Sequence, residues 1–132
     1  MSILRRIPME EVLAAAHTVW HEKATADIVA LSTVEILSGT YKRKFVFFNG
    51  KSAKSLVGGL FYILGFRYDA PKRQRELADK LGTTDVTIRG AYKQWLETFP
   101  DLFGDVLAKL AQDSAFRQYV LIDLKPKLST HS

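Results

Sequence analysis

The chain has no cysteine and only four prolines among its 132 residues. The lack of thiols excludes disulfides and thiolate metal sites, which agrees with a reducing intracellular setting. The prolines all lie near the edges of segments with helical periodicity, as an all-α chain requires. The longest apolar run, 55–66, is too short to cross a bilayer, and no apolar signal region follows the arginines near Met1. We therefore expect a soluble cytoplasmic protein, associated with the nucleoid, that binds no membrane.

Acidic residues are fewer than basic ones. Nineteen Lys and Arg against fourteen Asp and Glu give a formal charge of +5 and a pI of about 9.5. A pI above about 9 is common among nucleic-acid-binding domains. The stretch 40–56 contains no acid and holds five cations: Lys42, Arg43, Lys44, Lys51 and Lys54. Two interpretations stay open for this stretch, a solvated helix end with its loop or a patch that contacts phosphates.

Apolar residues spaced three and four apart predict five successive helices, over about 8–22, 26–44, 52–66, 71–81 and 84–98. The third helix has almost no polar face, so it should lie at the centre of a bundle. Its Gly58 and Gly59 each disfavour the helix by roughly 1 kcal/mol relative to alanine, and close approach of another helix would offset this. Asn49-Gly50 is a turn signal, and Asp69 is a candidate N-cap for the fourth helix.

Beyond Pro100 the apolar residues continue at helical spacing. Leu102, Phe103, Val106, Leu107 and Leu110 predict a sixth, amphipathic helix, and a shorter seventh is expected around Phe116, Tyr119, Val120 and Ile122. We expect a domain over 1–99, a helical extension over 100–124 and a flexible tail over 125–132. The apolar stripe of the extension has three interpretations: it covers core surface of a lone repeat, it forms a homodimer interface, or it makes a groove for a partner's helix.

Residues 76–92, ELADKLGTTDVTIRGAY, follow the pattern of a helix-turn-helix. Ala78 supplies the small residue needed where the two helices cross, and Gly82, four residues later, supplies the positive φ of a tight turn. Four apolar residues at the usual spacing would lock the two helices together: Leu77, Leu81, Ile88 and Ala91. We predict a helix-turn-helix at about 71–98.

The second helix of this pair has two distinct faces. Its buried stripe should consist of Ile88, Ala91, Tyr92, Trp95, Leu96 and Phe99. Val86 and Arg89 lie away from that stripe, near the N-terminus, where recognition helices contact base edges. Val86 could contact a thymine methyl and Arg89 a guanine or a phosphate, with Gly90 permitting close approach to a backbone. The other interpretation is that Val86 packs on a neighbouring helix and Arg89 only pairs with Asp85.

Taken together, residues 50–95 resemble the second cyclin-like repeat of archaeal and eukaryotic transcription factor IIB. The similar parts are the small-residue helix that opens with GKS, the QRELA segment and the DVTIRxxY segment. With weaker support from the first two helices, the resemblance covers about 9–98. It implies an all-α, cyclin-like five-helix bundle whose fourth and fifth helices form the helix-turn-helix, here followed by one or two extra helices.

The resemblance also implies a function. A domain of this kind reads the factor B recognition element beside a TATA box through the major groove, and it contacts the TATA-binding protein. Val86 and Arg89 fall at the family's base-reading valine and arginine, and Thr84 and Thr87 fall on the same DNA-facing segment. Lys51 falls where the family carries a basic residue near the DNA backbone. The expected phosphate contacts are Lys42, Arg43, Lys44, Lys51, Lys54, Lys72, Arg73 and Lys93.

The chain departs from the family in several places. The family has two repeats after a cysteine-bearing zinc ribbon that engages RNA polymerase, whereas this chain has one repeat and no cysteine. Gly90-Ala91 replaces a polar-basic pair of many members, and Arg73 replaces the usual helix-capping threonine. We expect a stand-alone relative that binds double-stranded DNA in transcriptional regulation. The alternative is a cyclin-fold interaction module that binds the TATA-binding protein or an RNA polymerase component without reading DNA.

Two further patterns resemble metal-binding or phosphate-binding motifs. His17 and His21 have a spacing that can chelate zinc, but no HExxH glutamate lies between them and no third ligand is evident. Residues 49–52 end like a phosphate-binding loop, but Phe45 stands where that loop needs a glycine. We therefore expect no metal, no cofactor and no enzymatic activity.

Overall fold

The computed structural model describes residues 8–119 and Ile122. They form seven α-helices: α1 Met9–Val19, α2 Lys23–Arg43, α3 Ala53–Arg67, α4 Gln74–Leu81, α5 Asp85–Thr98, α6 Leu107–Leu110 and α7 Ser114–Tyr119. Short 3-10 turns are η2 Phe45–Phe48, η3 Pro100–Leu102 and η4 Gly104–Val106. Strands are absent from the described residues. The all-α class is therefore confirmed.

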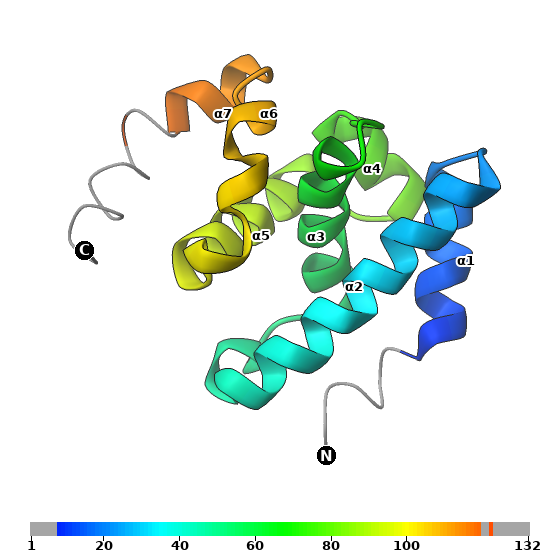
Figure 1. Ribbon diagram of the computed structural model, residues 1–132, viewed down its shortest axis with the longest axis horizontal. Helices are drawn as coiled ribbons and strands as arrows, with labels where there is room; N and C mark the ends of the chain where they lie inside the picture. Colours follow the sequence, from blue (N-terminus) through cyan, green and yellow to red (C-terminus); the bar gives the residue numbers. More distant parts are fainter. Residues whose placement is uncertain (1–7, 120–121, 123–132) are drawn as a thin grey trace.

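The centre of the molecule is α3, with α2 in front of it, α4 and α5 on its far side and the C-terminal elements to one side (Figure 1). Its residues from Leu56 to Phe66 are all buried. A Cβ added to Gly59 would lie 2.8 Å from the Cβ of Ala91, and one added to Gly58 would collide with the Ile88 side chain. The predicted central helix and the close helix crossing at its glycines are thus confirmed, and α1–α5 form the cyclin-like bundle.

The first helix ends earlier than predicted. It stops at Val19 rather than near residue 22, because Trp20 adopts extended backbone. The Trp20 indole N–H donates a 2.8 Å hydrogen bond to the carbonyl of Ala70. Its ring also packs edge-on against Phe61, with 5.3 Å between centroids. This long-range anchor turns the chain out of the helix, and no local pattern announces it.

The prediction that Asp69 caps a helix beginning near Pro71 is wrong. Asp69 has φ 59° and lies in the turn that closes α3, where its N–H donates to the carbonyl of Phe66. The helix begins only at Gln74, and its N-cap, Arg73, makes no side-chain capping bond. The intervening residues form an extended connection, as residues before and at a proline favour.

The C-terminal extension is not the single amphipathic helix predicted over 102–110. It forms η3, η4, which begins at the exposed Gly104, and the short α6, followed by α7. Five of the predicted apolar side chains are nevertheless buried: Phe103, Val106, Leu110, Phe116 and Tyr119. Leu102 and Leu107 are half-buried, and Ile122 is 70% exposed, contrary to the prediction. Val120 and the predicted tail over 125–132 lie outside the described residues.

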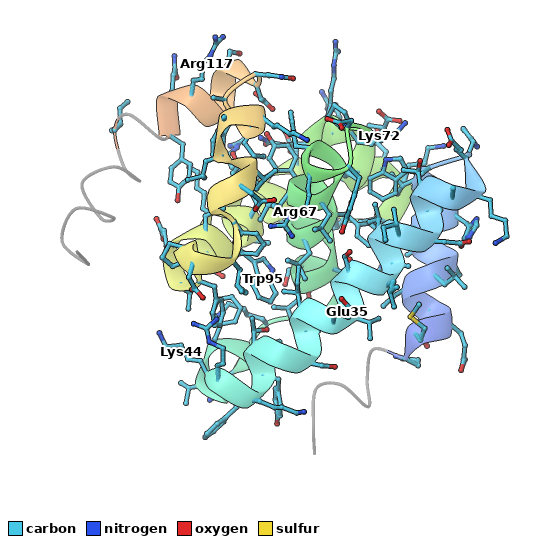
Figure 2. The ribbon with its side chains drawn as sticks, viewed as in Figure 1. Glu35, Lys44, Arg67, Lys72, Trp95 and Arg117 are labelled. Atoms are coloured by element: carbon cyan, nitrogen blue, oxygen red, sulfur yellow. The ribbon has the colours of Figure 1, made fainter. Side chains whose placement is uncertain are left out.

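Polar contacts fix this extension to α3. The Arg67 guanidinium donates to both carboxylate oxygens of Asp105, at 3.0 and 2.8 Å, and to the carbonyl of Leu102 at 2.6 Å. Tyr62 Oη donates to Asp113 at 2.7 Å. In Figure 2 the labelled Arg67 lies between α3 and the extension. Of the three interpretations of the apolar stripe, these contacts match the one in which it covers core surface.

Candidate nucleic-acid interface

The turn between α4 and α5 has the geometry that its sequence predicts. Gly82 ends α4 in the left-handed conformation, with φ 70°. Thr84 then caps α5, because its side-chain oxygen accepts a 3.1 Å hydrogen bond from the Thr87 N–H. Leu77 and Ala78 are buried, as are Ile88 and the other residues of the expected stripe on α5: Ala91, Tyr92, Trp95, Leu96 and Phe99. The two helices are locked together by these apolar residues, which leaves the opposite face of α5 outside.

Val86 and Arg89 lie on that outer face. Val86 is 66% exposed, so it does not pack on a neighbouring helix. A valine left in water beside a helix N-terminus gives the fold little stability, because its apolar area is not buried. Both side chains also lie clear of the described part of the C-terminal extension, since they are exposed with residues 8–119 in place.

Arg89 is held by two neighbours. Its Nε–H donates to Oε1 of Gln74 at 3.3 Å, and its Nη2 lies 3.9 Å from Oδ2 of Asp85. The pairing with Asp85 therefore exists, but it is long and both groups are half exposed, so it contributes little to stability. Gln74 in turn donates to Tyr92 Oη at 3.3 Å. These contacts extend the guanidinium along the outer surface toward the first residue of α4.

The two threonines of the predicted DNA-facing segment lie at the N-terminal end of α5. Thr84 is exposed and Thr87 half-buried, and their Oγ1 atoms lie 2.9 Å apart. Since Thr84 also accepts from the Thr87 N–H, its hydroxyl is committed to capping α5. The pair forms the rim of the outer face of α5.

Three predicted cations flank α4. Lys54 Nζ lies 3.5 Å from the carbonyl of Gly82, beside the turn. At the other end of α4, Arg73 is exposed and directly precedes Gln74, the partner of Arg89. Lys72 is half-buried, and its Nζ lies 3.7 Å from Oε2 of Glu76. These positive charges therefore lie at both ends of the helix that precedes the turn.

Two other predicted cations are engaged within the chain. Lys93 Nζ lies 4.8 Å above the ring of Tyr119. Lys51 Nζ donates to the carbonyl of Phe47 and lies 4.2 Å above the ring of the same residue. Partial burial of the Lys51 ammonium lowers its pKa. A phosphate would have to compete with these contacts for either ammonium.

The remaining cations lie elsewhere. Lys42 and Lys44 are exposed at the C-terminal end of α2. Arg43 pairs with Asp101 at 3.0 and 3.3 Å and lies 5.2 Å from the centroid of the Phe99 ring. Figure 2 shows Lys44 and Lys72 at opposite ends of the molecule. The predicted phosphate contacts thus divide into two groups rather than one patch.

Sequence reasoning missed three residues beside the candidate site. Gln74 links Arg89 to Tyr92, and Arg75 and Lys80 are exposed cations on α4. The spacing of polar residues in QRELADK could have indicated the exposure of the two cations. Nothing in the sequence indicates the link through Gln74, because it joins two different helices.

One of the two histidines is paired within the chain. His17 Nε2 pairs with Oδ1 of Asp27 at 2.9 Å. Across residues 8–119 and Ile122, no cluster of three or more His, Cys, Asp or Glu side chains is suited to hold a metal ion. Within the same residues, no helix has both the length and the apolar character needed to cross a membrane.

Comparison with known proteins gives one kind of match. No protein-family model and no solved structure matches the chain. Over 76 residues it is 34% identical to transcription initiation factor IIB of Pyrococcus furiosus, a stretch that covers 58% of this chain and 25% of the relative. Transcription initiation factor IIB 1 of Thermococcus kodakarensis is 33% identical with the same coverage. The factor of Aeropyrum pernix is 28% identical over 89 residues, 67% of this chain and 27% of the relative.

The chain therefore spans about a quarter of the length of the curated relatives it matches. The aligned length fits a partial, repeat-sized segment of those relatives. The resemblance inferred from residues 50–95 is confirmed: this chain is similar to one segment of archaeal transcription initiation factor IIB.

Proposed function

We propose that this protein binds duplex DNA through a helix-turn-helix formed by α4 and α5, as a stand-alone relative of the factor IIB repeat acting in transcription. The observation that carries the proposal is the exposure of Val86 and Arg89 on the face of α5 opposite its buried stripe. The similarity to transcription initiation factors supports the same assignment.

The shape of this face suits the major groove, which admits an α-helix. In that groove Val86 would contact a thymine methyl and the Arg89 fork would bind guanine O6 and N7. Gly90, beside Arg89, would permit close approach. A Cβ added there meets no atom of the chain within 4 Å, so the missing side chain has no role in internal packing. A glycine that weakens its own helix with no internal benefit supports an external surface in close contact.

Phosphate contacts would come from Lys54, Lys72 and Arg73, the cations that flank α4. We assign Lys51 and Lys93 no direct contact, because each ammonium already lies over an aromatic ring. The second group, at Lys42–Lys44, could reach phosphates only farther along a duplex. Contacts with the TATA-binding protein or RNA polymerase are a separate part of the proposal and would use other surfaces.

The test is a titration of labelled duplex DNA at several salt concentrations. Displaced counterions make the affinity fall with salt, with a logarithmic slope of about −0.9 per phosphate contact. Three contacts predict a slope of roughly −2 to −3. A selection from a random duplex pool should then recover a purine-rich element beside an A/T-rich tract. Absent binding, or binding insensitive to salt, would instead favour the interaction module that reads no DNA.

A further inference from the structure

The outer face of α2 has no partner in this chain. In Figure 1 the helix lies across the front of the bundle, and no described element covers it. Its inner face is buried against α1 and α3, whereas five residues spaced three and four apart form an exposed stripe along the helix: Ile28, Leu31, Glu35, Gly39 and Lys42. Leu31 is 46% exposed and Ile28 39%. We call this set the α2 stripe.

No packing contact within the described residues accounts for a glycine at position 39 of the α2 stripe. Glycine disfavours a helix relative to alanine. In α3 the packing of Gly59 against Ala91 compensates, but a Cβ added to Gly39 would meet no atom within 4 Å. An apolar hollow of about 200 Å³ lies beside it, lined in part by Ile36 and Leu102. The missing side chain therefore leaves the backbone open to close approach from outside.

Charged and then apolar side chains follow one another on both sides of Gly39. Glu35 comes four residues before it and Lys42 three residues after it. Neither charged group has an ion pair or hydrogen bond with a described residue. Leu31 lies beyond the acid. Just past the other end of the helix, Phe45 and Val46 are 60% and 61% exposed. The order is apolar, acid, glycine, base, apolar.

Such an order is complementary to itself when reversed. If two copies of α2 cross antiparallel at Gly39, Glu35 of each copy faces Lys42 of the other, and Leu31 faces the Phe45–Val46 end. A two-fold axis through the glycine makes both contacts twice, as an isologous interface requires. Figure 2 shows Glu35 on the front of α2, where a second copy would lie.

We propose that the α2 stripe binds a second copy of this chain. Charge complementarity favours this occupant over nucleic acid, because the carboxylate of Glu35, one turn from Gly39, would repel phosphate. The close approach of α3 and α5 at Gly59 shows, within the same molecule, how a glycine admits a second helix. The interface is separate from α4 and α5, so dimerisation can be measured without DNA.

The absence of cysteine allows a clean crosslinking test. Gly39→Cys introduces one thiol at the expected two-fold axis. Under mild oxidation it should form a disulfide-linked dimer, whereas Gln94→Cys, an exposed position on α5, should stay monomeric. Equal crosslinking of the two variants would overturn the proposal, because it would show random collision.

Charge reversal tests the predicted pairing. Sedimentation equilibrium should show a dimer of the wild-type chain. Glu35→Lys and Lys42→Glu should each raise its dissociation constant at least about tenfold, because like charges then face each other. The double variant Glu35→Lys/Lys42→Glu restores opposite charges and should restore the dimer. A wild-type chain that is monomeric at its highest soluble concentration, or a double variant no better than the singles, would contradict the proposal. Far-ultraviolet circular dichroism checks that all variants are folded.

Discussion

Gly59 and Gly90 are both inside helices, and their surroundings differ. Replacing Gly59 by alanine places a Cβ 2.8 Å from Ala91 Cβ and 2.9 Å from the backbone of the same residue. We expect this overpacking to destabilise the protein by about 1–3 kcal/mol. Gly90→Ala meets no neighbour and should stabilise it by about 1 kcal/mol. Urea denaturation measures both effects.

The same Gly90→Ala variant should bind duplex DNA more weakly, and unchanged affinity would refute close approach at this residue.

Tyr92 makes the stability depend on alkaline pH. Burial and, to a smaller extent, the charge of Asp113 raise its pKa from 10.0 to about 12, although Arg89 and the hydrogen bond from Gln74 oppose the shift. A raised folded-state pKa contributes stability that is complete below pH 10 and is lost as pH rises to about 12. The loss should be on the order of 2–3 kcal/mol.

Tyr92→Phe should flatten this dependence, because phenylalanine does not ionise. Urea denaturation of both proteins on either side of pH 10 would show the difference. Burial also raises the pKa of the stacked Tyr62, so a smaller alkaline slope should persist in the variant. An identical slope in the two proteins would show that Tyr92 ionises freely in the folded state.

At the scale of the element, α4 and α5 begin differently. Thr84 caps α5 with a side-chain hydrogen bond, whereas Arg73 offers α4 none. Thr84→Ala should therefore lower the free energy of unfolding by about 1 kcal/mol, and Arg73→Thr should raise it by a similar amount.

If Arg73 contacts phosphate, Arg73→Thr should also weaken DNA binding and lower the salt slope by about one. Calorimetry and the salt titration read the two effects separately. A more stable variant with unchanged salt slope would remove Arg73 from the interface.

Elements set by local signals were predictable from the sequence. The start of α3, the end of α4 and the start of α5 follow from Ser52, Gly82 and Thr84, whose capping roles depend only on neighbouring residues. The predicted helix bounds were wrong where contacts between residues far apart in the sequence determine the local backbone. Trp20 leaves α1 to bond Ala70, fifty residues away in sequence. From Pro100 onward the extension forms the turns η3 and η4 although its apolar spacing suits a helix.

The candidate site shows the same division. The exposure of Val86 follows from spacing on one helix, since it lies opposite the buried stripe. The engagement of Lys93 with Tyr119 and of Arg89 with Gln74 joins separate elements. Periodicity within one helix does not specify which side chain of another helix lies across from it. The contact partners of Lys93 and Arg89 could therefore not be predicted from the sequence.

At the scale of the whole molecule, the extension completes the core. Phe116 is fully buried and packs near Tyr92, with 6.0 Å between ring centroids. Phe116→Ala should cost about 3–5 kcal/mol, because it removes buried area and leaves a cavity. Arg117→Ala, an exposed neighbour on α7, is the matched control and should change stability by less than about 0.5 kcal/mol. If both variants unfold at the wild-type temperature, the extension adds no stability to the bundle.

The proposed function requires that the outer face of α5 reads base sequence. The most direct measurement is the affinity of the wild-type chain and of Arg89→Ala for a selected duplex and for a scrambled duplex of the same composition. We predict that Arg89→Ala loses about 1–3 kcal/mol on the selected duplex and almost nothing on the scrambled one. Equal losses on both duplexes would contradict sequence reading and leave Arg89 as a phosphate contact only.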